Sequence, residues 1–407
     1  MSPLASIRGT GGTLNDTAVV QNQNTLSHPK SHTKGEFIDI TEGSGSWTVP
    51  PGVTKICIVV VGGGGGGPPY GISEKAGGGG GGGGLTYGNN ITVKPGDSLP
   101  YYVGEGGSYY ASSGVAEDGD DTWIKNVDGD ILVEGEGGEG GEINIDYQSP
   151  GTNTYPSRQG GQGGFGGRSG PGSVPGPSGW GTVPYSAQGI AVSGGGDGGP
   201  GSDSKDLSPT SPTPGTTYTY FSKGGGGGGA GGWSNDGTPS HLQSGGRGGI
   251  NYVRYGGGGS FQYYYEHADD GLNGGAGGGS GRKGGGGVGL YGQGANGEGG
   301  RVFPSYMLQP AEGGSPSVIQ TENAYDAGEK GAGSQVPVTS GGGSDGTLSP
   351  GYSVSGGGVG GGGHSGQDWE PAQPENGSNG ANGAIRIVWG CGVSFPDNAD
   401  GHYPTPS

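Results

Sequence analysis

Short apolar runs bounded by turn residues dominate the hydrophobic pattern of this chain, and the longest is Ile56–Val61. Runs of this length that are rich in β-branched residues are typical of strands. No glycine-free stretch of ten residues repeats apolar positions at the 3.6-residue spacing of a helix, so we expect almost no α-helix. The strands that we expect are residues 37–40, 47–49, 54–61, 91–93, 100–103, 123–124, 131–133 and 384–389.

Turn signals separate several of these strands. Pro95-Gly96-Asp97 lies between one pair, and Asp128-Gly129, which lies between another pair, is a strong hairpin signal. This spacing predicts a small β-sandwich over residues 35–147. We expect the final strand, residues 384–389, to pair with the first strands and close the sandwich.

Glycine runs lie directly beside these strands. Residues 62–67 continue from the longest apolar run, and further runs are 77–84, 224–229, 256–259 and 284–287. Glycine makes up 113 of the 407 residues, and such a bias without a strict period usually indicates disorder. The 21 Tyr, 6 Trp and 6 Phe argue against disorder, because disordered chains are poor in aromatic residues.

The ordered arrangement that suits these runs is a bundle of polyglycine II helices. Collagen is excluded, because the runs break its rule of one glycine at every third position. A polyglycine II helix has three residues per turn and no internal hydrogen bonds, and without a Cβ its backbone groups can pair with those of neighbouring helices. The fold class that we expect is therefore mostly β and irregular, with a small β-sandwich at the chain ends that carries packed polyglycine II helices.

Composition divides the chain into four parts. Residues 1–34 are polar and lack any period, and we expect an N-terminal anchoring arm. Residues 35–147 form the β-rich part, and residues 148–380 are expected to form the polyglycine II bundle with long aromatic loops, beginning with loops over 148–217. Residues 381–407 hold the closing strand and a C-terminal tail.

The net charge of −18 and the two cysteines limit the possible functions. Nucleic-acid binding needs a basic face, so we expect no nucleic-acid partner. No segment approaches the ~20 consecutive apolar residues of a membrane span, and the first residues lack the apolar core of a secretory signal. Cys57 and Cys391 are expected to be small buried hydrophobic residues, and a disulfide between them is the alternative.

Several motifs resemble those of a known family. Residues 47–54, Trp-Thr-Val-Pro-Pro-Gly-Val-Thr, lead through the β-branched run into the first glycine run. The other matching segments are 77–85, 91–97, 103–107, 119–124 and 380–390. Together they resemble the glycine-rich domain of tailed-bacteriophage tail and tail-fibre proteins. The resemblance covers roughly residues 35–135 and 380–396, and the middle of the chain matches in composition only.

This resemblance implies a polyglycine II sandwich like that of the tip adhesins of some T-even-like phages, in which loops between glycine helices bind the host surface. It implies a virion protein that is assembled in the host cytoplasm and exposed on the particle. The partners that it implies are a host cell-surface receptor and other virion proteins, which we expect to be held through residues 1–34 and the β-rich part. A homo-oligomer, either a trimer or a tip on a trimeric fibre, is our expectation for its assembly.

Aromatic clusters between the glycine runs are the candidate receptor-binding residues, because Tyr and Trp offer large rigid faces with a polar group. The alternative is that these rings cover the flanks of the glycine helices, but three consecutive tyrosines cannot all face one core. The candidates are Tyr109, Tyr110, Trp180, Tyr218, Tyr220, Trp233, Tyr263, Tyr264 and Tyr265.

We expect that the protein is not an enzyme and that it has neither a cofactor nor a metal site. The acidic cluster Glu117–Asp121 and the pair Asp269-Asp270 lack the spacing of a known calcium loop, so turn-forming, solvated carboxylates are the better interpretation. The leading functional hypothesis is a virion adhesin that binds a host glycan or outer-membrane protein. The main alternative is a purely structural capsid or tail appendage, and ice binding and depolymerase activity are less favoured.

Overall fold

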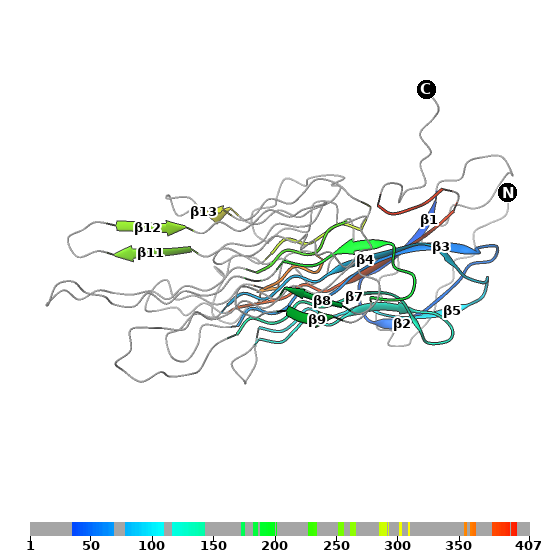
Figure 1. Ribbon diagram of the computed structural model, residues 1–407, viewed down its shortest axis with the longest axis horizontal. Helices are drawn as coiled ribbons and strands as arrows, with labels where there is room; N and C mark the ends of the chain where they lie inside the picture. The colour runs from blue at the N-terminus through cyan, green and yellow to red at the C-terminus, as the bar shows by residue number, and fades with distance from the viewer. Residues whose placement is uncertain are drawn as a thin grey trace, which may run out of the picture.

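The computed structural model describes residues 35–68, 78–109, 116–142, 188–199, 201, 227–233, 285–290, 292, 359–363, 377–390 and 392–396, together with the backbone of several short strands elsewhere. The described part is mostly β-structure and contains no α-helix, and its two main sheets are antiparallel and packed together (Figure 1). The arm predicted for residues 1–34 lies outside the described residues.

The first sheet has five strands, and both ends of the described chain contribute to it. Its order is β1 (Glu36–Ile40), β17 (Ala384–Trp389), β3 (Lys55–Val61), β4 (Leu85–Thr92) and β10 (Gly194–Gly196). Ile387 lies opposite Ile38 on one side and Ile58 on the other. The prediction that the last strand pairs with the first ones is therefore confirmed.

The second sheet has four strands in the order β2 (Ser44–Thr48), β5 (Ser98–Tyr102), β6 (Thr122–Lys125) and β7 (Ile131–Gly135). The predicted hairpin at Asp128-Gly129 joins β6 to β7, and Gly129 has a φ of 90° there. Gly96 has a φ of 88° in the other predicted turn. Glycine suits both turns because it adopts this left-handed region without a steric penalty.

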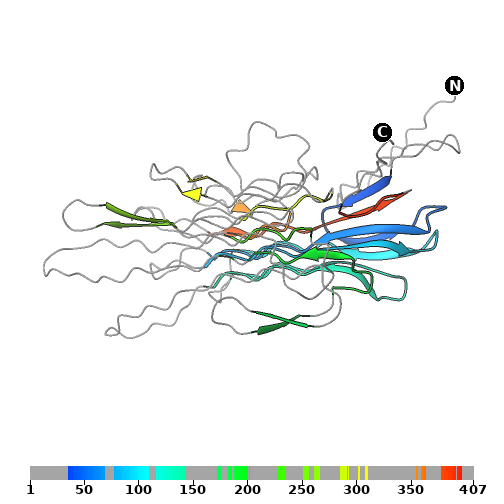
Figure 2. The ribbon, with the colours of Figure 1, turned by 45° about the horizontal axis from the view of Figure 1, so that its top comes forward.

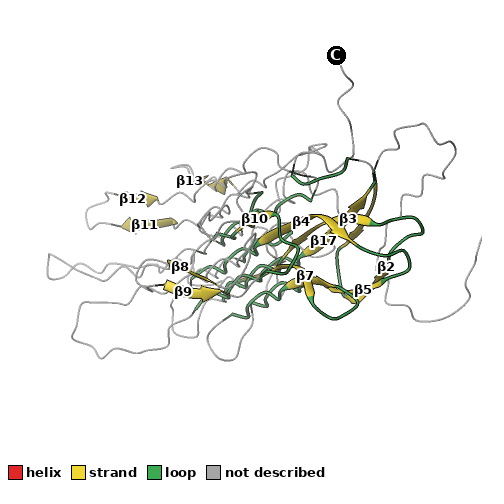
Figure 3. Cartoon of the chain, turned by 45° about the vertical axis from the view of Figure 1, so that its right-hand side comes forward, coloured by secondary structure: helices red, strands yellow, loops and turns green. Residues whose placement is uncertain are grey.

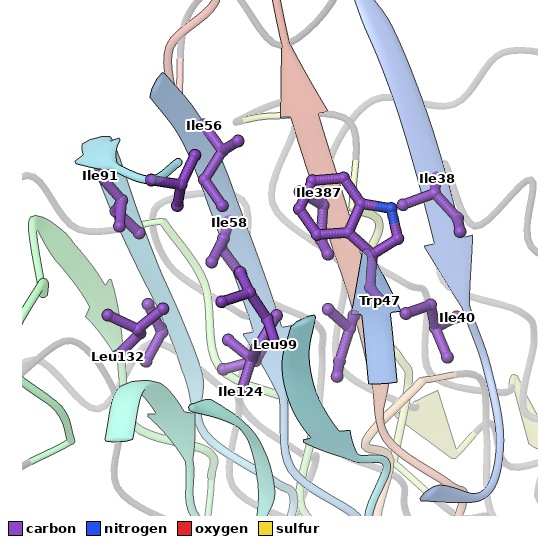
Figure 4. Packing of buried hydrophobic residues seen from close by; sticks show 14 of the residues in the cluster. Ile38, Ile40, Trp47, Ile56, Ile58, Ile91, Leu99, Ile124, Leu132 and Ile387 are labelled. Atoms are coloured by element: carbon purple, nitrogen blue, oxygen red, sulfur yellow. The ribbon is translucent and has the colours of Figure 1, made fainter. Parts of the chain in front are cut away.

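The main core lies between the two sheets (Figure 4). Alternate residues of β3 (Ile56, Ile58 and Val60) face this core, and the residues between them (Cys57, Val59 and Val61) join a second cluster on the other face of the sheet. Burial on both faces explains why β3 is a continuous apolar run rather than an alternating one. The rest of the main core comprises Ile38, Ile40, Trp47, Val49, Ile91, Val93, Leu99, Val103, Ile124, Leu132, Val133, Ile385 and Ile387.

The second cluster also contains the described cysteine. Cys57 is a buried, free thiol, as the sequence predicted, and its Sγ lies 3.5 Å from the carbonyl oxygen of Val393. Cys391 lies outside the described residues. The cluster also includes the aromatic group of Tyr87, Trp233 and Phe395, which brings a strand, a glycine segment and the C-terminal segment together.

One buried ion pair bridges β1 and β17. Nη1 of Arg386 lies 2.9 Å from each carboxylate oxygen of Asp39, and its guanidinium lies 4.0 Å from the ring centroid of Phe37. Burial raises the pKa of Asp39, and the nearby Arg386 opposes this shift. Removing either partner would leave a buried charge without compensation, so we expect both residues to be needed for stability.

Residues 188–196 close one side of the sandwich. The N–H of Ile190 donates to the carbonyl of Ile131 on β7, and the N–H of Ser193 donates to that of Tyr87 on β4.

The expectation of loops over 148–217 was wrong in part, because β8 (Gly172–Pro175), β9 (Thr182–Tyr185) and β10 lie in this range. Strand β10 consists of glycine alone and pairs through its backbone, so no alternating side-chain pattern marks it.

Glycine segments continue beyond the strand ends and lie side by side in a bundle (Figure 3). Residues 62–67 follow β3, residues 78–84 precede β4, and residues 136–142 follow β7. The described segments that also belong to this bundle are 104–108, 116–121, 197–199, 227–233, 285–288, 359–363 and 377–383. Most of the hydrogen bonds that hold the described segments of the bundle together join backbone groups of different segments.

These hydrogen bonds repeat every three residues. Gly62 and Gly65 donate to the carbonyls of Gly84 and Gly81, and along the same neighbour Gly81 and Gly84 donate onward to Glu139 and Glu136. The segments pack so closely that a Cβ on Gly62 would collide with the carbonyl of Glu136, and one on Gly65 with that of Glu139. Glycine is therefore required here by the close approach of neighbouring backbones.

Candidate functional site

The Tyr263–Tyr265 cluster lies in a two-stranded hairpin, β11 (Asn251–Tyr255) and β12 (Phe261–Tyr265). Both views place this hairpin at the end of the molecule away from β2 and β5, which we call the distal end (Figures 1 and 2). Tyr264 is paired with Tyr252, Tyr263 with Val253 and Tyr265 with Asn251. The three tyrosines therefore occupy successive positions of β12.

The other candidates fall into three groups. Tyr109, at the end of the 104–108 segment, is half-buried, and its N–H donates to Oδ1 of Asn379 at 2.8 Å. Trp233 is only 1% exposed, and its ring centroid lies 5.3 Å from that of Phe395. A ring so deeply buried has no free face for a receptor, so we leave Trp233 out of the proposed binding surface. Candidates outside the described residues are Tyr110, Trp180, Tyr218 and Tyr220.

Two acidic side chains of the bundle take the place of backbone acceptors. Oδ1 of Asp118 accepts the N–H of Gly140 at 2.7 Å, and Oδ1 of Asp121 accepts that of Gly137 at 2.9 Å. Both donors and both acceptors are three residues apart, so the side chains follow the repeat of the backbone hydrogen bonds. By contrast, Asp128 lies in the β6–β7 turn, as the turn interpretation predicted.

The electrostatics at the junction of sheet and bundle perturb three titratable groups. A hydrogen bond to Asp120, 2.5 Å long, raises the pKa of Tyr102 to about 12. Desolvation, with help from Asp121, raises the pKa of Glu134 to about 7. Desolvation also raises the pKa of Asp121 itself, although its bond from Gly137 opposes this. In the described part of the chain no group of His, Cys, Asp or Glu is arranged to hold a metal ion.

Sequence reasoning missed the side chains that accept hydrogen bonds at the borders of the bundle. Asn379 and Asn382 accept backbone N–H groups of residues 104–109 through their side-chain oxygens. Asp118 and Asp121 accept N–H groups of residues 136–142 in the same way. The signal was present in the three-residue spacing of Asn379 and Asn382. The same three-residue spacing occurs in Glu136-Gly-Gly-Glu139-Gly-Gly-Glu142, where every third residue carries a side chain.

Comparison with known proteins identifies the class. A family model described as a glycine-rich domain matches residues 40–307, and the chain belongs to this glycine-rich domain family. No curated protein has a matching sequence. No helix among the described residues is long and apolar enough to cross a membrane.

Proposed function

We propose that the glycine segments are polyglycine II helices. The support is the three-residue repeat around residues 62–67, because a helix with three residues per turn presents every third N–H to the same neighbour. The donors in this segment fall into three such pairs, and the acceptors in each pair are also three residues apart. The donor pairs and their acceptors are Gly62 and Gly65 to Gly84 and Gly81, Gly63 and Gly66 to Asp120 and Glu117, and Gly64 and Gly67 to Ala381 and Ser378.

Carbonyl groups of the same segment accept from three further segments, so six neighbours surround it. Gly63 accepts from Gly138 and Gly66 accepts from Gly141, again three residues apart. The other two accepting contacts are with Gly107 and Gly363. Six neighbours around one rod correspond to hexagonal packing, which requires a rod without side chains. Backbone torsions near φ −75° and ψ +145° in an experimental structure would test this assignment.

We propose further that the protein is a bacteriophage virion surface or tail-fibre protein that binds a host glycan or outer-membrane protein. The observation that carries this proposal is the distal hairpin β11–β12, which places a tyrosine-rich ribbon at the far end of a tightly bonded bundle (Figure 1). Tyrosine suits recognition because it offers a rigid ring and a hydroxyl at a low entropy cost. Membership of the glycine-rich domain family is compatible with this proposal.

The proposal includes the assembly. Residues 1–34 and the sandwich would attach the protein to other virion proteins, as a trimer or as a tip on a trimeric fibre. A purely structural appendage is the second candidate, and the burial of Trp233 favours it, because one nominated ring serves the core instead.

Adsorption of labelled protein to a panel of bacterial strains tests the receptor function. We expect saturable binding to particular strains, retained without residues 1–34 and lost when Tyr263, Tyr264 and Tyr265 are changed together to Ser. The matched control is Tyr102→Ser, which removes a half-buried tyrosine at the junction of the sheet and the bundle, away from the distal hairpin. Equal binding by the triple variant and the control would place the site elsewhere, and no binding to any strain would favour the structural appendage.

A further inference from the structure

Two reactive dipeptides lie side by side in the bundle. Residues 379–380 and 382–383 are both Asn-Gly, the sequence in which a peptide nitrogen most readily attacks the neighbouring carboxamide, because glycine has no side chain to hinder it. They lie three residues apart in the segment that leads into β17. Asn379 and Asn382 are both half-buried, so water can reach their side chains.

The same two hydrogen bonds hold each dipeptide. Oδ1 of Asn382 accepts the N–H of Gly106 at 2.9 Å, and the N–H of Gly383 donates to the carbonyl of Gly104 at 2.9 Å. Three residues earlier, Oδ1 of Asn379 accepts the N–H of Tyr109 at 2.8 Å, and the N–H of Gly380 donates to Gly107 at 2.9 Å. The carboxamide and the nitrogen that would attack it are thus both held in the bundle.

The fold itself requires these residue types. Asparagine supplies the oxygen that accepts an N–H from the neighbouring segment. Glycine is needed next to it, because a Cβ on Gly380 would collide with the carbonyl of Gly64, and one on Gly383 with that of Val61. The packing therefore requires an Asn-Gly dipeptide at both places, and the same packing restrains both dipeptides.

We propose that Asn379 and Asn382 are deamidation sites that the folded bundle protects, so that a chain opened here for long accumulates isoaspartate and cannot return to its register. In the reaction the nitrogen of Gly383 loses its proton and bonds to Cγ of Asn382, and the bond from Cγ to the amide nitrogen breaks, which releases ammonia. Water then opens the succinimide ring at either carbonyl and leaves aspartate or isoaspartate.

Isoaspartate explains why the change would be irreversible. It routes the main chain through the side chain and adds one methylene before the next glycine. The carbonyl of Ala381 accepts from Gly64 and the N–H of Gly383 donates to Gly104, and the two bonds depend on a fixed spacing. An extra methylene between these groups prevents both bonds from forming together.

Mass spectrometry of the wild-type protein tests the proposal directly. Folded protein and protein held unfolded in urea are incubated in the same mildly alkaline buffer and cleaved after Glu375. Replacement of NH2 by OH is then followed at each asparagine. We expect deamidation in the folded protein to be at least roughly tenfold slower, because several hydrogen bonds must open together and tenfold corresponds to about 1.4 kcal/mol of opening free energy. Equal rates in the two states would overturn the proposal.

Refolding provides the second test. The yield of refolded wild-type protein should fall with the time spent unfolded, in step with the isoaspartate content at residues 379 and 382. The matched control is the double variant Asn379→Asp and Asn382→Asp, which keeps the accepting oxygens but has no amide to lose. Its yield should decay less with time. A wild-type yield that does not depend on the time spent unfolded would show that the modification does not block refolding, and would overturn that part of the proposal.

Discussion

Single glycines in the bundle carry a packing role that most proteins assign to large apolar side chains. Gly80 donates its N–H to the carbonyl of Gly363 at 2.8 Å, and a Cβ on it would collide with the carbonyl of Gly65. The obstacle is the backbone of Gly65 and Gly66, which cannot rotate away as a side chain can. Substitutions that are mild elsewhere should therefore be severe here.

Gly80→Ala is the test of this view. We expect it to lower the free energy of unfolding by about 3 kcal/mol, because the added methyl group must displace a neighbouring segment. Chemical denaturation measures the difference. The control is Glu105→Ala, at an exposed position of another segment, for which we expect a change within about 0.5 kcal/mol. Equal stability of the two variants would mean that the 78–84 segment does not pack as described.

The raised pKa of Glu134 gives a second prediction at this scale. A carboxyl group whose pKa rises from 4.5 in the unfolded chain to about 7 in the folded one binds its proton more tightly when folded. Its contribution to stability is then complete at acidic pH and is lost as the pH rises through about 7. We expect the melting temperature of the wild-type protein to fall as the pH rises from about 5 to about 7, and that of the Glu134→Gln variant to fall less. The same pH dependence in both proteins would contradict the assigned shift.

Among the elements, β17 is a central strand, because it lies between β1 and β3 and joins the two ends of the described chain. Ile387 is fully buried in the main core. Ile190 also belongs to a segment that borders the sandwich, but it is 69% exposed. The two isoleucines form a natural pair for comparing a central with a peripheral element.

Ile387→Ala should destabilise the protein by about 2–5 kcal/mol, because it removes buried methyl groups and leaves a cavity. Ile190→Ala should change stability by no more than about 0.5 kcal/mol, because its side chain is already in water. Urea titration of both variants gives the comparison. Similar losses in the two variants would mean that the sandwich does not depend on β17 as the topology indicates.

Elements with side-chain patterns were predictable, and elements without them were not. The apolar run of β3, the closing strand β17 and the turn at Asp128-Gly129 followed from the sequence because each depends on side chains or turn chemistry. Strand β10 was missed because glycine pairing leaves no pattern. Of the candidate site, Trp233 was misplaced, because an aromatic residue beside a glycine run can either cover the core or face solvent, and composition does not distinguish the two.

At the scale of the whole molecule, continuous backbone joins the sandwich to the bundle. Strand β3 runs directly into the 62–67 segment, and the 78–84 segment runs directly into β4. Each glycine from 62 to 67 donates its N–H to another segment, over 2.8–3.0 Å. Segments bonded on all sides cannot open singly, so the bundle and the sandwich should unfold as one cooperative unit.

Hydrogen exchange of the native protein tests this cooperativity. The amides of residues 62–67 should exchange as slowly as those of residues 58–61, because both need the same global opening. Gly129 is the internal control, since its N–H makes a weaker bond of 3.2 Å in an exposed turn and should exchange much faster. If the glycine amides exchanged as fast as Gly129 while β3 stayed protected, the sandwich would be the only stable unit. A bundle that opened so freely could not hold the distal hairpin in place, and the proposed receptor-binding function would lose its structural basis.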